Sequence, residues 1–368
     1  MRIERLMLKN YRNYDECIID FPDNINVLIG KNAQGKTNLL EALYLAILGK
    51  SYRASHDEEL IQFVQTQCIV KLAITAHDTN QELALLFNRG QKKEIFLNQD
   101  KIRQNNLIGL FHAVLFSPDD LYLLKGSPAE RRRFLDIEIS QTSPAYYKQL
   151  LKYNRILLQR NTLLKNIREK KSSENLLAPW DENLAEAGSY LVCKRFYFIE
   201  KLAALAYQMH LRLTGEQEQL LIHYVQQDSE EQQNLAERLF IFTWLKTKLA
   251  AGREKDIWRG TTGVGPHRDD LSFHINDVDT KIYGSQGQQR TAILSLKLAE
   301  LEYIKLEIGE YPLLLLDDVM SELDMSRRAY LLDFIKERIQ TFITATDISD
   351  FPKNHFGKIY TIKQGRVK

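Results

Sequence analysis

The first third of the chain carries short apolar runs with the length and spacing typical of β-strands. Ile3, Leu6 and Leu8 open the first run, and a second run ends at Phe21. Between residues 68 and 102 three alternating runs are separated by the turn-forming tripeptides Asn-Arg-Gly and Asn-Gln-Asp. Alternation interrupted by such turns predicts an antiparallel meander.

The middle of the chain follows a helical pattern instead. Apolar residues recur at heptad-like steps between about residues 144 and 213, with a polar break at residues 172–181. Two helices of roughly 30 residues, each about 45 Å long and joined by this break, predict an antiparallel hairpin. We interpret the Gln/Glu-rich residues 226–233 as a linker or an exposed helix start, and residues 235–251 as a further helix.

Composition is that of an ordinary globular protein. The chain has 368 residues, 44% of them hydrophobic and 27% charged, and a formal net charge of +2. Its three cysteines lie far apart without metal-ligand spacing, which indicates reduced thiols. The N-terminal residues lack the apolar core of a secretory signal, and the longest apolar run, residues 39–48, is too short to span a bilayer. We therefore expect a cytoplasmic protein without a membrane partner.

A glycine-rich segment, GKNAQGKT, separates an apolar run at residues 25–29 from an apolar-periodic stretch that begins at Leu39. Its G-x-x-x-x-G-K-[ST] spacing is that of a phosphate-binding P-loop, whose glycines let backbone N–H groups approach a phosphate. Lys36 is expected to face solvent until it meets the β- and γ-phosphates of ATP, and the Thr37 hydroxyl to ligate Mg²⁺. The predicted nucleotide-binding residues of this segment are Gly30, Lys31, Asn32, Ala33, Gln34, Gly35, Lys36, Thr37 and Asn38.

A fully apolar run at residues 313–316 ends in Asp317 and Asp318. This pattern is typical of a buried parallel strand whose carboxyl end faces a ligand crevice. Asp317 is predicted to hold Mg²⁺ directly or through water, and Asp318 to be the base or water-orienting carboxylate that acts with Lys36 in catalysis. The alternative interpretation is a core strand followed by a solvated acidic turn.

The segment Ser-Gln-Gly-Gln, residues 285–288, precedes a long amphipathic helix, so its amides would form a second anion site. Ser-x-Gly-Gln resembles the signature motif of ABC-type ATPases, with a plain helix cap as the alternative. Its place before Asp317, and the D-loop-like Ser-Glu-Leu-Asp at residues 321–324, follow the ABC order. We therefore add to the predicted nucleotide contacts Ser285, Gln286, Gly287 and Gln288.

The P-loop and Asp317 lie near opposite ends of the chain, so both ends would build an ATPase head with the helical hairpin inserted between them. This plan resembles the SMC-like branch of the ABC-type ATPases. Residues 9–14 (KNYRNY), 117–136 and 265–271 (GPHRDDL), together with the short hairpin, resemble the RecF family of bacterial recombination mediators. The resemblance implies an α/β fold with a head at residues 1–116 and 263–368 and a mainly α-helical arm at 117–262. It also implies that Arg12 flanks the adenine.

The same resemblance implies a function. RecF-like proteins bind ATP and Mg²⁺, form an ATP-dependent homodimer on double-stranded DNA at gaps or junctions, and act with RecO and RecR to load RecA. A weak, DNA-stimulated ATPase and roles in replication restart and the SOS response are implied as well. Thr346 and Asp347 stand where ABC enzymes usually carry a switch histidine, and no Q-loop glutamine can be placed near residues 116–119. Both departures argue against fast hydrolysis.

Two other functions stay open. A transporter ATPase subunit would carry a switch histidine and a compact helical insert, and an SMC-type structural tether would need much longer coiled coils. The arm's charge distribution bears on DNA binding, because residues 148–171 hold eight Lys/Arg and a single acidic residue. This stretch is either a phosphate-tracking surface or a solvated helix face. The candidate DNA contacts are Arg131, Arg132, Lys148, Lys152 and Arg155.

The polar run His267-Arg268-Asp269-Asp270 also has two interpretations. It could form a functional cluster near the head. A structural ion-pair cluster at a turn is the favoured interpretation.

Overall fold

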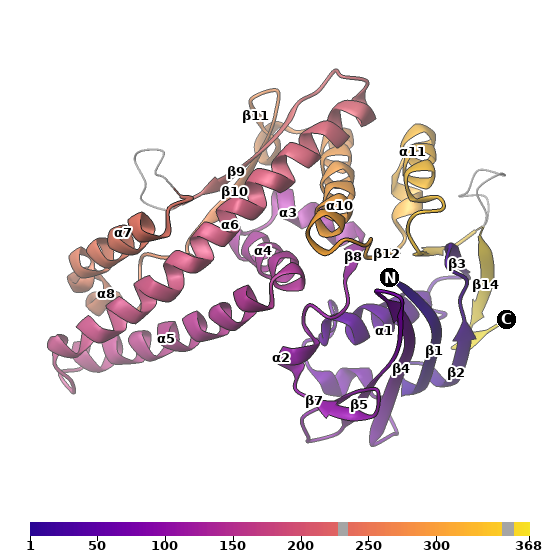
Figure 1. Ribbon diagram of the computed structural model, residues 1–368, viewed down its shortest axis with the longest axis horizontal. Coiled ribbons are helices and arrows are strands. Elements are labelled where there is room, and N and C mark those ends of the chain that lie inside the picture. Colours follow the sequence, from indigo (N-terminus) through magenta and orange to yellow (C-terminus); the bar gives the residue numbers. More distant parts are fainter. Residues whose placement is uncertain (227–234, 348–356) are drawn as a thin grey trace. The chain divides into compact units, whose positions relative to one another are not determined.

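The computed structural model describes residues 1–226, 235–347 and 357–368. Most of the Gln/Glu-rich stretch interpreted above as a linker or helix start, residues 227–233, lies outside this range. The chain divides into two compact units, Met1–Asp120 with Ile293–Lys368, and Leu121–Ala292. In Figure 1 the second unit carries the long helices α5 (Pro144–Arg168) and α6 (Leu177–Thr214).

The domain boundaries expected from the sequence stay a prediction. The second compact unit runs beyond residue 262, to Ala292. The extension has a physical reason, since strand β10 (Asp270–Ile275) pairs along its whole length with β9 (Leu220–Val225). Strand β11 (Val278–Asp279) and helix α9 (Thr280–Tyr283) follow β10 in the same unit.

Two sheets build the first unit. The antiparallel sheet has the order β2-β1-β4-β5-β6-β7. Its strands are β1 (Arg2–Tyr11), β2 (Tyr14–Asp20), β4 (Gln67–Ala76), β5 (Thr79–Asn88), β6 (Glu94–Leu97) and β7 (Asp100–Ile102). The pairing of β4, β5, β6 and β7 in sequence confirms the predicted meander.

The second sheet of this unit joins the two ends of the chain. Its order is β15-β14-β3-β13-β12-β8, parallel except for β15 at the edge. The strands are β3 (Ile25–Ile29), β8 (Ala113–Phe116), β12 (Leu313–Leu316), β13 (Thr341–Ala345), β14 (Lys358–Lys363) and β15 (Arg366–Val367). All four leucines of β12 are buried, as expected for a central parallel strand. The predicted head built from both chain ends is confirmed.

Helix α1 (Lys36–Leu48) contacts strands of both sheets of the first unit. Almost every one of its residues is buried, which explains why its sequence is apolar all round instead of amphipathic. Glu41 is the exception in this apolar sequence and is completely buried. The other long helices of the unit are α11 (Met325–Ile335) and the C-terminal part of α10 (Gln286–Ile308).

In the second unit α5 and α6 form the predicted antiparallel hairpin, although with unequal lengths of 25 and 38 residues. Ser143 caps α5 by accepting from the Tyr146 amide, and α6 ends at Gly215 in the left-handed region. The remaining helices are α3 (Tyr122–Lys125), α4 (Pro128–Thr142), α7 (Arg238–Ala251) and α8 (Arg253–Arg259). Helix α7 confirms the helix expected at residues 235–251. Among the described residues, no helix combines the length and apolar character needed to cross a membrane.

Three arginines are buried inside the second unit and each faces a carboxylate, namely Arg131, Arg160 and Arg195. Arg160, which has no exposed surface, donates to Asp181 at 2.7 Å and to Asp256 at 2.8 Å. Arg195 pairs with Asp136 at 2.7 Å. These contacts come from α4, α5, α6 and α8, so they tie the helices of the unit to one another.

The run from His267 to Asp270 belongs to the same network. Asp270 accepts from Nε and Nη2 of Arg131, and Asp269 accepts from the Tyr224 hydroxyl. His267 lies 2.7 Å from the Tyr153 hydroxyl. The interpretation of this run as a structural cluster at a turn is therefore confirmed.

Candidate functional site

The P-loop occurs where the sequence places it, between β3 and α1. Gly35 precedes the first residue of α1 with φ of 114°, in the region that favours glycine. A Cβ on Gly30 would lie 2.4 Å from the carbonyl oxygen of Ile362 on β14, closer than any side chain tolerates. Both glycines of the motif therefore have a structural reason in this fold.

The Lys36 side chain folds back over its own loop. Its Nζ donates to the Gly30 carbonyl at 2.6 Å and to the Lys31 carbonyl at 3.2 Å. Only 4% of the residue is exposed, so the expectation that Lys36 faces solvent is wrong. An ammonium group has three donors and no acceptor, and the nearby carbonyl oxygens satisfy two of them. The charge itself is not neutralised by these contacts.

Segments from both chain ends brace the P-loop. The Asn13 side chain, in the turn between β1 and β2, donates to the Gln34 carbonyl at 3.0 Å. The amide of Gly365, in the turn between β14 and β15, donates to the same carbonyl at 3.0 Å. The Tyr14 hydroxyl donates to the Gly35 carbonyl at 2.9 Å. Sequence reasoning missed these bracing residues, since nothing in their local pattern connects them to the P-loop.

Asp317 and Thr37 lie side by side, as predicted for a shared Mg²⁺. The Thr37 hydroxyl donates to Asp317 Oδ1 at 3.0 Å. Asp317 also accepts from the hydroxyls of Thr344 at 2.9 Å and Tyr52 at 3.1 Å. Burial raises the pKa of the Asp317 carboxyl, and these hydroxyl donors oppose the rise. A buried carboxylate served by three neutral hydroxyls carries a charge that a cation could neutralise.

This pair fits Mg²⁺ of the kind that nucleotides bring. Mg²⁺ prefers oxygen ligands and commonly keeps only one or two from the protein, the rest coming from phosphates and water. No cluster of three or more His, Cys, Asp and Glu residues that could hold a metal occurs among the described residues. One carboxylate and one hydroxyl next to a phosphate site therefore suit a metal that is held jointly with a nucleotide.

Asp318 adopts a left-handed backbone conformation with φ of 54°, which non-glycine residues rarely adopt. Its amide donates to the Thr344 hydroxyl at 2.8 Å, and its Oδ1 lies 3.3 Å from the same hydroxyl. The side chain lines a cavity of about 190 Å³ together with Asn32 of the P-loop, Ser321 and Thr346. The turn thus directs the Asp318 carboxylate into a small cavity beside the P-loop. A carboxylate that orients the attacking water would have to lie there.

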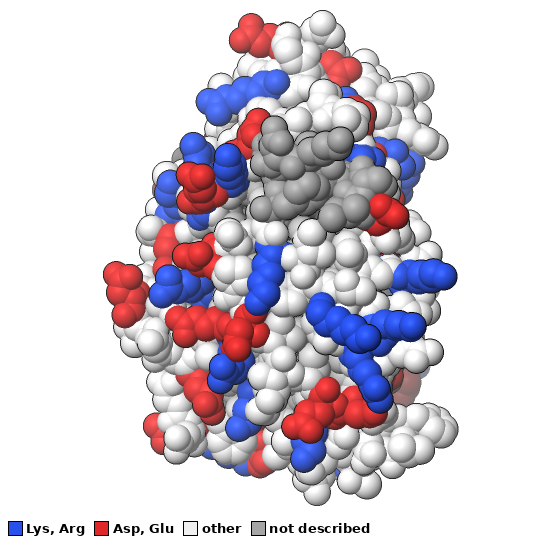
Figure 2. All heavy atoms as spheres, turned by 90° about the vertical axis from the view of Figure 1, so that its right-hand side faces the viewer, with Lys and Arg blue, Asp and Glu red and all other residues white. Residues whose placement is uncertain are grey.

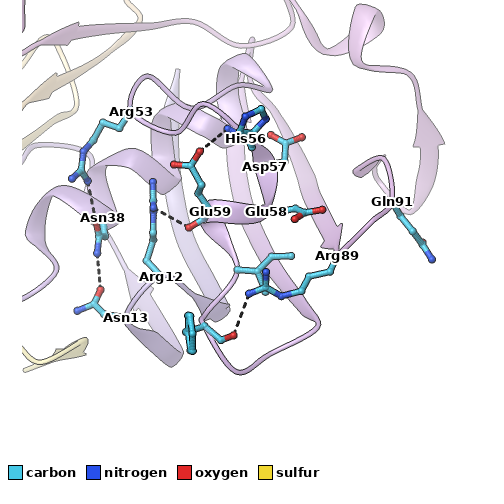
Figure 3. Close-up of a pocket in the computed structure, with 12 residues that line it drawn as sticks. Arg12, Asn13, Asn38, Arg53, His56, Asp57, Glu58, Glu59, Arg89 and Gln91 are labelled. Carbon is cyan, nitrogen blue, oxygen red and sulfur yellow. Dashed lines mark hydrogen bonds between the residues drawn. The ribbon is translucent and has the colours of Figure 1, made fainter.

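A larger pocket of about 960 Å³ is lined in part by Asn38 in the first turn of the P-loop helix α1 (Figure 3). Arg12 lines it and is fixed by Glu41 through two hydrogen bonds, at 2.8 and 3.0 Å. Arg53 donates to Asn38 at 3.0 Å from the same wall. The full lining is Arg12, Asn13, Asn38, Arg53, His56, Asp57, Glu58, Glu59, Ile61, Phe63, Arg89 and Gln91.

Only Arg12 and Asn38 of this pocket were predicted. Glu41 offered a signal for the rest, because a lone acid inside the apolar stretch at residues 39–48 requires a cationic partner when the helix is buried. Arg12 and Arg53 are such cations, the latter at 3.7 Å. Phe63 is 94% exposed at the rim of the pocket, and no sequence pattern marks it.

The signature-like residues belong to the second unit. Ser285 and Gln288 cap α10 reciprocally, with the Gln288 amide 3.2 Å from Ser285 Oγ and the Ser285 amide 3.0 Å from Gln288 Oε1. Ser285, Gln286 and Gly287 are exposed. The helix cap that the sequence offered as an alternative is thus present, and it leaves the tip of the helix accessible to an anion.

The candidate DNA contacts differ in accessibility. Arg131 is 4% exposed and held by Asp270, so we remove it from the set. Arg132 is half-buried and donates to the Asp269 carbonyl. The exposed members are Lys148, Lys152 and Arg155, which share one face of α5. On the face of the molecule drawn in Figure 2, acidic and basic side chains are interspersed without a broad basic surface.

Comparisons with known proteins agree with this geometry. The family model described as RecF/RecN/SMC N terminal domain matches residues 2–366. The DNA replication and repair protein RecF of Halalkalibacterium halodurans is 44% identical, with 100% of this chain and 99% of the relative covered. The RecF protein of Staphylococcus carnosus is 40% identical over the whole of both chains.

Solved structures lead to the same group. A structure of the recombination mediator protein RecF-ATP in the RecFOR pathway has a TM-score of 0.92 and 37% identity, covering 100% of this chain and 96% of the other. An Smc head bound to the C-winged helix domain of ScpA has a TM-score of 0.58 at 14% identity, covers 100% of this chain and 96% of the other, and shares the fold alone. The fold is therefore that of an ABC-type ATPase head of the SMC-like class. Within that class, the chain belongs to the RecF family.

Proposed function

We propose that this protein is an ATP-dependent DNA-binding protein of recombinational repair. The single observation that carries the proposal is a P-loop whose Lys36 lies over the loop and whose Thr37 donates to the buried Asp317, in a chain that closely resembles an ATP-bound RecF. The other functions considered from the sequence lose support. Family membership disfavours a transporter subunit, and helices of 25 and 38 residues are far too short for a long tether.

The first unit offers a place for each part of ATP. The P-loop amides and Lys36 bind the phosphates, and Thr37 with Asp317 holds the accompanying Mg²⁺, which supplies charge neutralisation when bound. The 960 Å³ pocket lined by Arg12 takes the nucleoside, with Phe63 at its rim available to cover the base. Asp318 orients a water for slow hydrolysis. Thr346, which lines the same small cavity, has no group that could act as the missing switch histidine.

The exposed Ser285 end of α10 serves a nucleotide held by a second copy of the chain. ATP bound between two such copies would hold the dimer on DNA until hydrolysis releases it. We extend the proposal to cytoplasmic, nucleoid-associated action with RecO and RecR in loading RecA at gaps, because a RecF relative is assigned to the RecFOR pathway. Lys148, Lys152 and Arg155 are the proposed contacts to duplex phosphates.

Two opposing variants test this function by sedimentation with ATP and Mg²⁺. Ser285→Arg is expected to bind ATP normally as a monomer and to fail to dimerise, because a bulky side chain occupies the phosphate contact. Asp318→Asn is expected to dimerise and to remain dimeric on DNA, because ATP still binds but the water-orienting carboxylate is lost.

Ser285→Ala controls for the lost helix cap, and Ser173→Arg introduces the same bulk at an exposed turn residue. Both controls should dimerise. Normal dimerisation of Ser285→Arg would remove the cross-subunit role of Ser285. Failure of Asp318→Asn to accumulate a dimer would contradict the proposed gating by hydrolysis.

A further inference from the structure

One corner of the second unit presents a large aromatic side chain to water. Trp258 lies in the last turn of α8 and is 75% exposed. Burying an indole side chain is among the largest apolar contributions available to a fold, so an indole left outside is unusual. Helix α8 contacts α5, and its residue Ile257 is half-buried, whereas Trp258 beside it is exposed.

Cationic residues of two elements lie at the end of α8 that carries this indole. Arg168 Nη1, at the end of α5, donates to the Trp258 carbonyl at 3.4 Å. A Cβ on Gly260 would lie 3.0 Å from Lys165 Cγ, so the Lys165 stem also packs beside the end of α8. Arg259 follows Trp258 directly, and all three of these basic residues are exposed.

The acids close to this corner offset little of that charge. Asp256 is buried and already accepts from Arg160 at 2.8 Å. Glu169, which follows α5, forms an ion pair with Lys171 at 2.7 Å. Glu254, one turn before Trp258, is the exposed acid of α8. The corner therefore combines an exposed aromatic plate with an excess of positive charge.

A purely structural account explains part of this arrangement. Basic side chains near the C-terminus of a helix stabilise its last carbonyls, and Arg168 does so at Trp258. That account gives no reason for the exposed indole next to it. It also leaves Arg259, whose side chain is exposed, without a role.

We propose that Trp258, Lys165, Arg168 and Arg259 form a contact site for unpaired nucleic acid. A base would stack on the indole, and the flanking phosphates would lie against the three cations, which is how sequence-independent single-strand sites are built. A closed duplex hides the faces of its bases, so an exposed indole favours a single strand over a duplex. The excess of cations favours phosphates over an apolar protein segment. The inference rests on the proposed function only in taking the polymer to be DNA.

Tryptophan fluorescence tests the site directly on the full-length chain without ATP. Oligo(dT) is expected to quench the emission, and Trp258→Phe to abolish most of that quenching. Trp258→Ala is expected to weaken oligo(dT) binding by about 5- to 150-fold, the range for loss of one stacked base. Trp244→Phe, on α7, is the matched control and should keep the quenching.

The charges are tested by the salt dependence of oligo(dT) affinity. Lys165→Ala combined with Arg168→Ala should reduce the log–log slope by about 1.4, since each single-strand phosphate contact contributes about 0.7. The exposed pair Lys92→Ala with Arg103→Ala should leave the slope unchanged. Circular dichroism and thermal unfolding of each variant control for its overall fold.

Unchanged quenching in Trp258→Phe would overturn the proposal. So would equal quenching of Trp258 by a blunt duplex or by poly-glutamate, the latter indicating an acidic protein partner instead. These results are separable from the proposed function, because ATP-dependent dimerisation is measured on the same variants and does not use Trp258. If the wild-type protein did not bind ATP, the proposed function would be wrong, whereas the oligo(dT) result would still hold.

Discussion

The buried charges of the P-loop site in the first unit and those between the helices of the second unit are compensated in different ways. In the second unit Arg160, Arg195 and Arg131 each lie against carboxylates. In the first unit Lys36 contacts two carbonyls and Asp317 contacts three hydroxyls, and neither belongs to an ion pair among the described residues. Paired buried charges hold helices together. Charges that are solvated only by neutral groups mark the place where a ligand supplies the counter-charge.

The physical reason lies in the cost of moving a charge out of water. An ion pair offsets that cost within the folded chain itself, so removing one partner leaves the other exposed to the full penalty. A lone charge among carbonyls or hydroxyls is only partly compensated, and it gains more when a phosphate or a metal ion arrives. The comparison therefore predicts opposite consequences for substitutions at the P-loop site and at the arginine pairs of the second unit.

The largest effect is expected at Arg160. Arg160→Met keeps much of the apolar stem but leaves Asp256 buried without its cation and Asp181 with Arg253 alone, which should lower the free energy of unfolding by about 3–5 kcal/mol. All three tryptophans lie between residues 121 and 292, so urea unfolding followed by their fluorescence reports on the second unit. Arg155→Met, at an exposed position of the same helix, is the control and should change stability by less than about 0.5 kcal/mol. Equal effects of the two variants would contradict the structural role of the buried pairs.

The second largest effect is expected at Lys36, where substitution should weaken ATP binding and leave the stability of the fold almost unchanged. Lys36→Met removes a charge-assisted contact to phosphate and should weaken ATP binding by about 10- to 100-fold. The free energy of unfolding should change by less than about 1 kcal/mol, because Lys36 has no carboxylate partner to leave unpaired. Calorimetric ATP titration and thermal unfolding of the same variant decide the point. A large loss of stability with intact ATP affinity would make Lys36 a structural residue like Arg160.

The sequence predicted the parts of the fold and site that depend on local pattern. Spacing alone located the P-loop, the apolar strand β12 and the helical hairpin, because each is specified by neighbouring residues. The bracing of Gln34 by Asn13 and Gly365 could not be predicted, since both are tertiary contacts and the one from Gly365 crosses more than three hundred residues. The burial of individual side chains could not be predicted from the sequence pattern either.

Basic residues show this limit most clearly. Along residues 148–171 the sequence gives eight cations of equal appearance, yet Arg160 is completely buried while Lys148 and Arg155 are exposed. The carboxylates that hold Arg160 come from α6 and α8, so its burial is decided by tertiary packing. Of the candidate DNA contacts predicted on α5, Lys148, Lys152 and Arg155 are all exposed.

The smallest effect is expected at His267, which the second unit buries in its neutral form instead of pairing its charge with a carboxylate. His267 Nε2 lies 3.1 Å from the Thr262 carbonyl oxygen, which can only accept, so Nδ1 is left to accept from Tyr153. Burial is the largest cause that lowers the pKa of His267, and with the neighbouring arginines Arg268, Arg132 and Arg195 it brings that pKa to about 4 against the opposing Thr262 contact.

The direction of the pH dependence follows from this depressed pKa. Between the unfolded value of 6.5 and about 4, the unfolded chain binds a proton at His267 that the folded chain does not. The free energy of unfolding therefore falls as pH decreases through this window and is fully retained above it. From pH 7.5 to 5.5 the contribution of His267 amounts to roughly 1 kcal/mol.

Tryptophan-detected urea unfolding at pH 7.5 and 5.5 measures this contribution. His267→Gln keeps a polar side chain of similar size and should be less stable than the wild type at pH 7.5, with the difference shrinking by roughly 1 kcal/mol at pH 5.5. His223→Gln, at an exposed position of β9 in the same unit, should show no such convergence. If the stability of His267→Gln fell with pH as steeply as that of the wild type, His267 would not be the neutral member of the network. In that case the folded second unit would accept a proton at His267 without a counter-charge, as the first unit holds the Asp317 carboxylate without one. The difference between the two would then rest on the arginine–carboxylate pairs alone.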